Sequence, residues 1–273
     1  MGSLEEVLDG EKVVQGLGKV RTWEIAKIHD LPSTNTDFLS VLSSRISNSS
    51  NPFTKETIEE VLVRAEILDE AVGSTQVKNI ITELIGDAKF INHEDLLTNL
   101  NSCFSGNGIP DLPKLNTQLN EFREGQYWIT RGEDIKISKE LNPGQQYNNE
   151  VDGLLLNSNG ILEAKYPHVA GLNAINNVFS NLESIIGKFT TESRLTQFWK
   201  NIYPKRYGQI NIANGSFSNL TEPSEFVQAV RDAGIIGSEP GLSFFTKAEL
   251  QSLEELHILV GDRRIIITPQ DWD

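Results

Sequence analysis

The sequence predicts an α/β protein in which an all-helical N-terminal domain precedes a mixed β-sheet flanked by helices. Apolar residues recur at helical spacing through the first hundred residues, whereas the second half alternates short strand-like segments with helical ones. A segment rich in glycine and proline separates the two patterns. We therefore expect a helical domain over residues 1–104, a linker over 105–113 and an α/β domain over 114–273.

Three apolar stripes predict the helices of the N-terminal domain. The first follows Thr54, which we expect to cap a helix, the second ends at Gly86, and the third begins near Asn92. These stripes are more typical of a helical core than of a ligand site. Their members are Ile58, Val61, Leu62, Ala65 and Leu68, then Val77, Ile80, Ile81, Leu84 and Ile85, then Leu96, Leu97 and Leu100.

The composition excludes several classes of protein. A hydrophobic content of 38% and a charged content of 23% indicate a soluble globular chain. No apolar run approaches the roughly 18 residues that a membrane span needs, so we expect no membrane partner. The single cysteine, Cys103, excludes an intramolecular disulfide and a cysteine-based zinc site, and we expect a packed thiol there.

The second half predicts a set of strands and helices. A short helix over Leu115–Glu124 is expected before the strands, and residues 172–189 return to helical spacing. The expected strands are Tyr127–Thr130, Ile135–Ser138, Glu150–Leu156, Gly160–Tyr166 and Gln209–Ala213, with a further hairpin formed by Leu256–Val260 and Arg263–Thr268.

The predicted hairpin around Asn157–Gly160 carries three residues that suggest chemistry: Asp152, Glu163 and Lys165. Glu163 and Lys165 are two apart and share a face of their strand. Asp152 joins that face only if the hairpin loop has an even number of residues, because a one-residue change of register reverses every side chain. The turn composition favours the even count, and we expect Val151, Leu162 and Ala164 on the opposite, buried face.

Crowded carboxylates need a compensating charge, and Mg²⁺ or Mn²⁺ prefers such oxygen ligands. The pattern Asp152, ten intervening residues and then Glu163-Ala-Lys165 resembles the PD-(D/E)XK nuclease superfamily, although Val151 stands where that name has proline. The resemblance implies a restriction-endonuclease-like fold and a metal-dependent hydrolase of phosphodiester bonds. It further implies Asp152, Glu163, Glu150 and Glu121 or Glu124 as candidate metal ligands, with Lys165 acting on the attacking water. Two alternatives stay open. Glu150 is a metal ligand or a solvated charge at the end of its strand, and the whole hairpin is a metal site or an exposed surface with an ordinary Glu–Lys pair.

A net charge of −14 is unusual for a nucleic-acid enzyme. The balance over residues 160–220 is nevertheless positive, so a local phosphate groove is compatible with the sequence. The candidate nucleic-acid contacts are Lys188, Arg194, Lys200, Lys205 and Arg206.

The resemblance leaves the biological role open. The resemblance implies DNA in preference to RNA as the substrate, and an endonuclease of either toxin or restriction/repair type. A helical domain before the nuclease is similar to bacterial toxin effectors, which would have an immunity protein as partner. We expect a cytoplasmic location, or delivery into a target cell's cytoplasm for a toxin. The alternative is a catalytically inactive nuclease-like module that binds other proteins.

Overall fold

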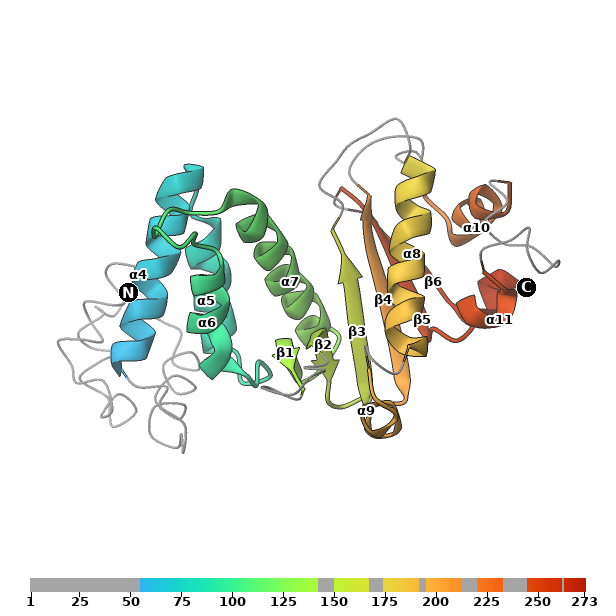
Figure 1. Ribbon diagram of the computed structural model, residues 1–273, viewed down its shortest axis with the longest axis horizontal. Coiled ribbons are helices and arrows are strands. Elements are labelled where there is room, and N and C mark those ends of the chain that lie inside the picture. The colour runs from blue at the N-terminus through green and yellow to red at the C-terminus, as the bar shows by residue number, and fades with distance from the viewer. Residues whose placement is uncertain are drawn as a thin grey trace, which may run out of the picture. The chain divides into compact units, whose positions relative to one another are not determined.

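The structure of the protein is a computed structural model that describes residues 55–141, 150–166, 174–191, 195–212, 220–232, 245–261 and 263–273. Thr54, Arg194 and His168 lie outside these residues. The fold is α/β, with helices preceding a six-stranded mixed sheet, as the sequence predicts (Figure 1). The chain divides into two compact units, Met1–Lys136 and Ile137–Asp273.

The first unit is built from helices whose predicted apolar stripes are buried. Helix α4 packs on α5 and α6, and α7 packs on the same two helices. Every member of the three stripes is buried except Leu97, which is half-buried. The described helices of this unit are α4 (Lys55–Val72), α5 (Gln76–Gly86), η2 (His93–Asp95), α6 (Leu96–Ser102) and α7 (Leu112–Thr130).

The segment 105–113 forms a closed turn within the first unit, so the division of the chain differs from the predicted linker. Phe104 bridges to Pro110, and the Asp111 amide donates to the Cys103 carbonyl at 2.8 Å. Asp111 then caps α7 by accepting from the Lys114 amide at 3.3 Å. The glycine and proline signals therefore mark a tight turn and a helix start.

The predicted strand over Tyr127–Thr130 is wrong, because these residues form the last turn of α7. Their aromatic and β-branched side chains favour a strand locally, but Trp128 is buried in the helical packing. The helix ends at Gly132 in the left-handed conformation (φ 96°), whose amide donates to the Ile129 carbonyl at 2.9 Å.

The second unit is organised around the sheet, whose strands lie in chain order from β1 to β6. The β2–β3 and β5–β6 pairs are antiparallel, whereas β3–β4 and β4–β5 are parallel. Both predicted hairpins are therefore confirmed. The strands are β1 (Ile135–Glu140), β2 (Glu150–Leu155), β3 (Gly160–Lys165), β4 (Lys205–Ile212), β5 (Glu255–Val260) and β6 (Arg263–Ile267).

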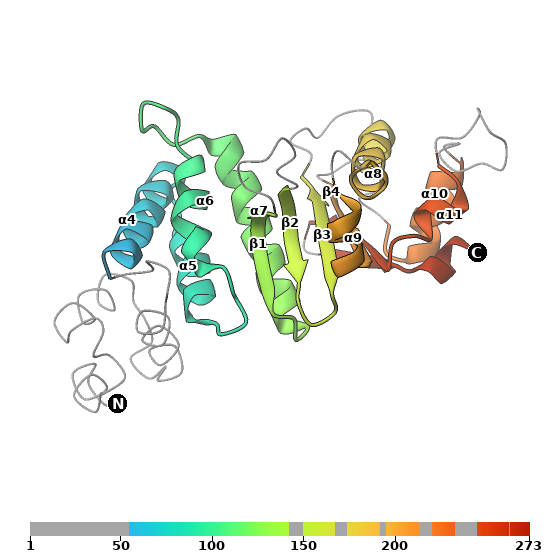
Figure 2. The ribbon, with the colours of Figure 1, turned by 60° about the horizontal axis from the view of Figure 1, so that its bottom comes forward.

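Helices cover the sheet of the second unit and complete its core. Helix α8 (Ala174–Thr190) runs along β3 and β4 (Figure 1). The short α9 (Gln197–Ile202) precedes β4 and lies beside the sheet (Figure 2). α10 (Pro223–Asp232) packs on β6 and η3 (Pro269–Trp272), and α11 (Lys247–Leu250) also contacts η3.

Cys103 is a packed thiol, as expected. It has no exposed surface, and burial raises its pKa to about 11, so the reactive thiolate is scarce near neutral pH. Across the described part of the chain, we find no helix with the length and apolar character of a bilayer span.

Asp69 generates a testable prediction for the first unit. Its buried carboxylate accepts from the Val77 and Lys78 amides at 2.8 and 2.9 Å and so caps α5. We expect Asp69→Ala to lower the free energy of unfolding by about 1–2 kcal/mol, because two amides lose their acceptor. Urea unfolding followed by circular dichroism measures the change, with the exposed neighbour Glu70→Ala as control. Equal stability of the two variants would contradict the capping role.

Candidate active site

The β2–β3 hairpin has the even loop that the candidate site requires. Leu155 pairs with Gly160, so four residues, 156–159, connect the strands. Asn159 takes the left-handed conformation (φ 55°), which asparagine tolerates better than most residues. The predicted parity of the loop is confirmed, and it determines which side chains share a face.

Gly160 allows the hairpin to pack closely on β4. A Cβ atom at this position would lie 2.5 Å from Cε2 of Tyr207, a distance that real contacts do not permit. Tyr207 is itself buried, and its strand position pairs with Leu162. The aromatic ring thus fixes the start of β3, and it is unavailable for stacking on a base.

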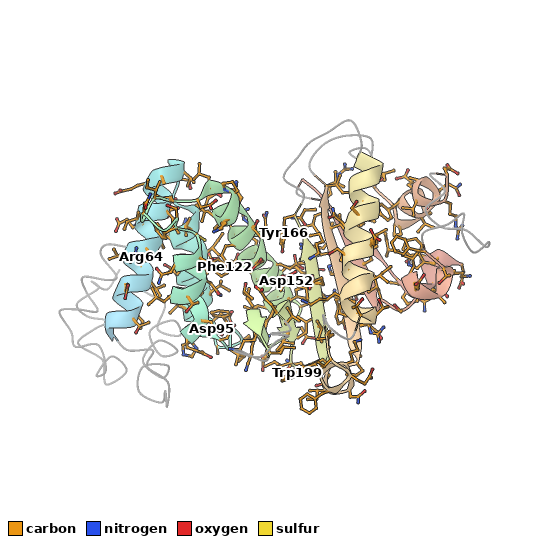
Figure 3. All side chains as sticks on the ribbon, in the orientation of Figure 1. Arg64, Asp95, Phe122, Asp152, Tyr166 and Trp199 are labelled. Atoms are coloured by element: carbon orange, nitrogen blue, oxygen red, sulfur yellow. The ribbon has the colours of Figure 1, made fainter. Side chains whose placement is uncertain are left out.

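The main-chain pairing of the hairpin ends at Gly153 and Leu162; Asp152 comes just before Gly153 and Glu163 just after Leu162. The Ala164 amide donates to Oδ2 of Asp152 at 2.6 Å. This side-chain hydrogen bond joins the two strands where their main-chain pairing ends. Asp152 is half-buried and is labelled in Figure 3.

Glu163 is a buried carboxylate with cations at both of its oxygens. The side chain is only 7% exposed. Oε1 accepts from Lys165 Nζ at 2.6 Å, and Oε2 lies 3.7 Å from Lys188 Nζ. That second distance is too long for a hydrogen bond, and Oε2 is buried with no hydrogen-bond partner. Glu163 is therefore charge-compensated but incompletely hydrogen-bonded.

Helix α8 brings Lys188 to Glu163 through a close approach at Gly208. Gly208 pairs with Glu163, and a Cβ atom there would lie 3.1 Å from Cγ2 of Ile185. The helix can therefore approach β4 beside the candidate site. Lys188 lies three residues beyond Ile185, on the same side of the helix, and its ammonium group also donates to the Glu150 carbonyl.

The face of the hairpin that carries Glu163 is buried as well. Val151, Leu162 and Ala164 are buried as expected, but so are Leu154 and Ile161 on the face that carries Glu163. The face with the acids also faces α8, which is why Lys188 reaches it. The interpretation of the hairpin as an exposed Glu–Lys surface pair does not describe Glu163.

The other candidate ligands are placed less favourably. Glu150 begins β2 and is exposed, and it contributes its main-chain carbonyl to Lys188. Glu121 lies on α7 in the first unit, where its carboxylate accepts from the Gln118 amide at 3.0 Å. Glu124 lies on the same helix and is buried. The role of Glu121 and Glu150 as metal ligands stays a prediction.

The candidate nucleic-acid contacts differ in their exposure and in the groups that they contact. Lys188 lies 3.7 Å from Glu163, and its role as a nucleic-acid contact stays a prediction. Lys205 is exposed, Lys200 is half-buried, and Arg206 lies over the Phe189 ring at 5.9 Å. Only Lys205 is fully exposed among the described members of this set, and Arg194 lies outside the described residues.

The donor set fits a magnesium-type site better than an all-protein cage. No group of three or more His, Cys, Asp or Glu side chains is arranged to hold a metal among the described residues. Mg²⁺ commonly takes one or two carboxylates and keeps several waters. Asp152 and Glu163 supply two carboxylates, and the buried, unbonded Oε2 of Glu163 is an oxygen that lacks a partner. These residues are therefore compatible with such an ion.

A second polar cluster, on the other face of the sheet, was not predicted from the sequence. His257 is fully buried between Glu255, which contacts its Nε2 at 2.7 Å, and Arg264, which contacts its Nδ1 at 2.7 Å. Arg264 also donates to Gln209 at 3.1 Å, and Gln209 to Asn211 at 3.0 Å. Because arginine only donates, Nδ1 accepts and Nε2 carries the proton. Period-two spacing of polar residues in β4 and β5 is the signal that could have revealed this cluster.

Comparison of the chain with protein-family models, with curated proteins and with solved structures finds no match.

The packing of Gly160 against Tyr207 gives a second prediction. We expect Gly160→Ala to lower the free energy of unfolding by about 1–3 kcal/mol, because the new methyl group displaces the ring. The loss should be smaller when the same change is made in a Tyr207→Leu background, which provides space. Denaturant unfolding of the four proteins gives the coupling, with Gly106→Ala, which meets no atom within 4 Å, as control. Simple additivity of the two substitutions would refute the close contact.

Proposed function

We propose that the protein is a metal-dependent nuclease of the PD-(D/E)XK type that hydrolyses phosphodiester bonds of DNA or RNA. The observation that carries the proposal is the pair of side-chain contacts at the end of the β2–β3 pairing, where Asp152 accepts from the Ala164 amide and the buried Glu163 accepts from Lys165. The chain order α7, β1, β2, β3, α8, β4 also agrees with the helix, strands and helix that a restriction-endonuclease-like fold requires.

Asp152 and Glu163 would hold the Mg²⁺ or Mn²⁺ ion. Such an ion, when bound, lowers the pKa of a coordinated water and stabilises negative charge on the phosphate. The protein contributes by fixing the two carboxylates before substrate arrives: the Ala164 amide holds Asp152, and Lys165 holds Glu163. This preorganisation reduces the rearrangement that the reaction needs.

Lys165 has a role that follows from its ion pair. Bonded to a carboxylate at 2.6 Å, it is an ammonium group, which donates hydrogen bonds and has no lone pair. Its side chain is 26% exposed, so this group is suited to orienting the attacking water and to balancing the charge that develops on the phosphate. The Lys165 ammonium group could act as a base toward the water only after it had lost a proton.

The helices that precede the sheet support a toxin-type effector within this proposal, with an immunity protein as partner. A restriction or repair endonuclease is the alternative use of the same site. The remaining alternative is a nuclease-like module without activity, and the following experiment distinguishes it from an active enzyme.

The third prediction tests the reaction itself. We expect the full chain to cleave plasmid DNA, single-stranded DNA or total RNA with Mg²⁺ or Mn²⁺, and chelation to abolish cleavage. Glu163→Gln and Lys165→Met should each lower the rate by about 100-fold or more, since each removes a charge required for the reaction. Gel electrophoresis of timed reactions measures the rates.

The matched control is Glu183→Gln, which makes the same change at an exposed position of α8 and should cleave like the parent. The proposal fails if no substrate is cleaved in the presence of metal, or if Glu163→Gln retains the parent's rate while remaining folded.

A further inference from the structure

Lys188 is the cation of the cluster that the proposed reaction does not use. It comes from α8, whereas Asp152, Glu163 and Lys165 come from the sheet. Its side chain is 15% exposed, so the ammonium group is largely removed from water. A lysine in such a place is costly unless a negative group compensates it, and Glu163 Oε2 at 3.7 Å is the carboxylate oxygen it faces.

The two oxygens of Glu163 differ in a way that bears on metal binding. Oε1 is hydrogen-bonded to Lys165, whereas Oε2 is buried and has no hydrogen-bond partner. Lys188 lies close enough to Oε2 for a strong Coulomb interaction but directs a hydrogen bond to the Glu150 carbonyl. Oε2 is therefore the oxygen able to bind a metal ion. A metal ion bound there would lie close to the positive charge of Lys188.

We propose that Lys188 is an internal counter-cation for Glu163, which positions this carboxylate in the metal-free protein and competes electrostatically with a divalent cation for it. The proposal rests on the function proposed above. Two cations near one carboxylate repel each other, and at a few ångströms in a partly buried site this repulsion is strong. Lys188 thus preserves the site without metal and weakens its affinity for metal.

The experiment separates the charge of Lys188 from its hydrogen bond. Lys188→Gln keeps a donor for the Glu150 carbonyl but removes the charge, and Lys188→Arg keeps the charge. Binding of Mn²⁺ to the full chain is measured by titration calorimetry, and the melting temperature is measured without metal. We expect Lys188→Gln to bind Mn²⁺ about tenfold or more tightly than the parent and to melt at a lower temperature without metal. Lys188→Arg should resemble the parent in both measurements.

Two controls identify the cause. Lys247→Met removes an exposed lysine of the same unit and should leave the affinity unchanged. Combining Lys188→Gln with Glu163→Gln should abolish the gain in affinity, because the carboxylate in question is gone. If Lys188→Gln does not fold, Lys188→Met is measured in its place.

The outcomes distinguish this inference from the proposed function. If the parent binds Mn²⁺ and cleaves nucleic acid but Lys188→Gln binds no more tightly, the counter-cation role is refuted and the nuclease stands. If Lys188→Gln binds Mn²⁺ and the parent does not, the inference is supported even without cleavage. If neither binds Mn²⁺, the inference is refuted together with the metal site.

Discussion

The charge of the buried Glu163 carboxylate has to be compensated within the second unit. Glu163 lies on β3 beside the buried apolar residues Ile161, Leu162 and Ala164, where an isolated charge is strongly unfavourable. Two ammonium groups compensate it, one from its own strand and one from α8. The strand, the helix and the close approach at Gly208 are all needed to bring these groups together.

The compensation of Glu163 depends on how the core of the unit is packed. α8 is an apolar helix over most of its buried face, with Val178, Leu182 and Ile185 packed in the core. The position of Lys188 follows from that packing, because the helix has little freedom to rotate or slide once these side chains interdigitate. The electrostatics of the candidate site is therefore determined by hydrophobic contacts more than by polar ones.

The sequence predicted local features well and long-range ones poorly. The residues Asn157–Gly160 and the alternation around them were enough to predict the hairpin and its even loop. Nothing local predicted the contact of Lys188, because it depends on how α8 crosses β4. The strand predicted at Tyr127–Thr130 failed for a related reason, since helix packing around Trp128 overrides local preference. The α/β class was predictable from periodicity, whereas the position of the boundary between the two units depends on packing and was not.

The buried polar chain from Glu255 to Asn211 has a consequence for how the sheet assembles. Its members come from β4, β5 and β6, so the chain closes only when all three strands are aligned as observed. A slip of one residue in β5 would turn His257 toward the aliphatic side and leave Arg264 and Gln209 without their partners. Apolar strands rich in isoleucine and leucine could tolerate several alignments. The polar chain makes one alignment far more favourable than the others, so its contribution is to the uniqueness of the fold.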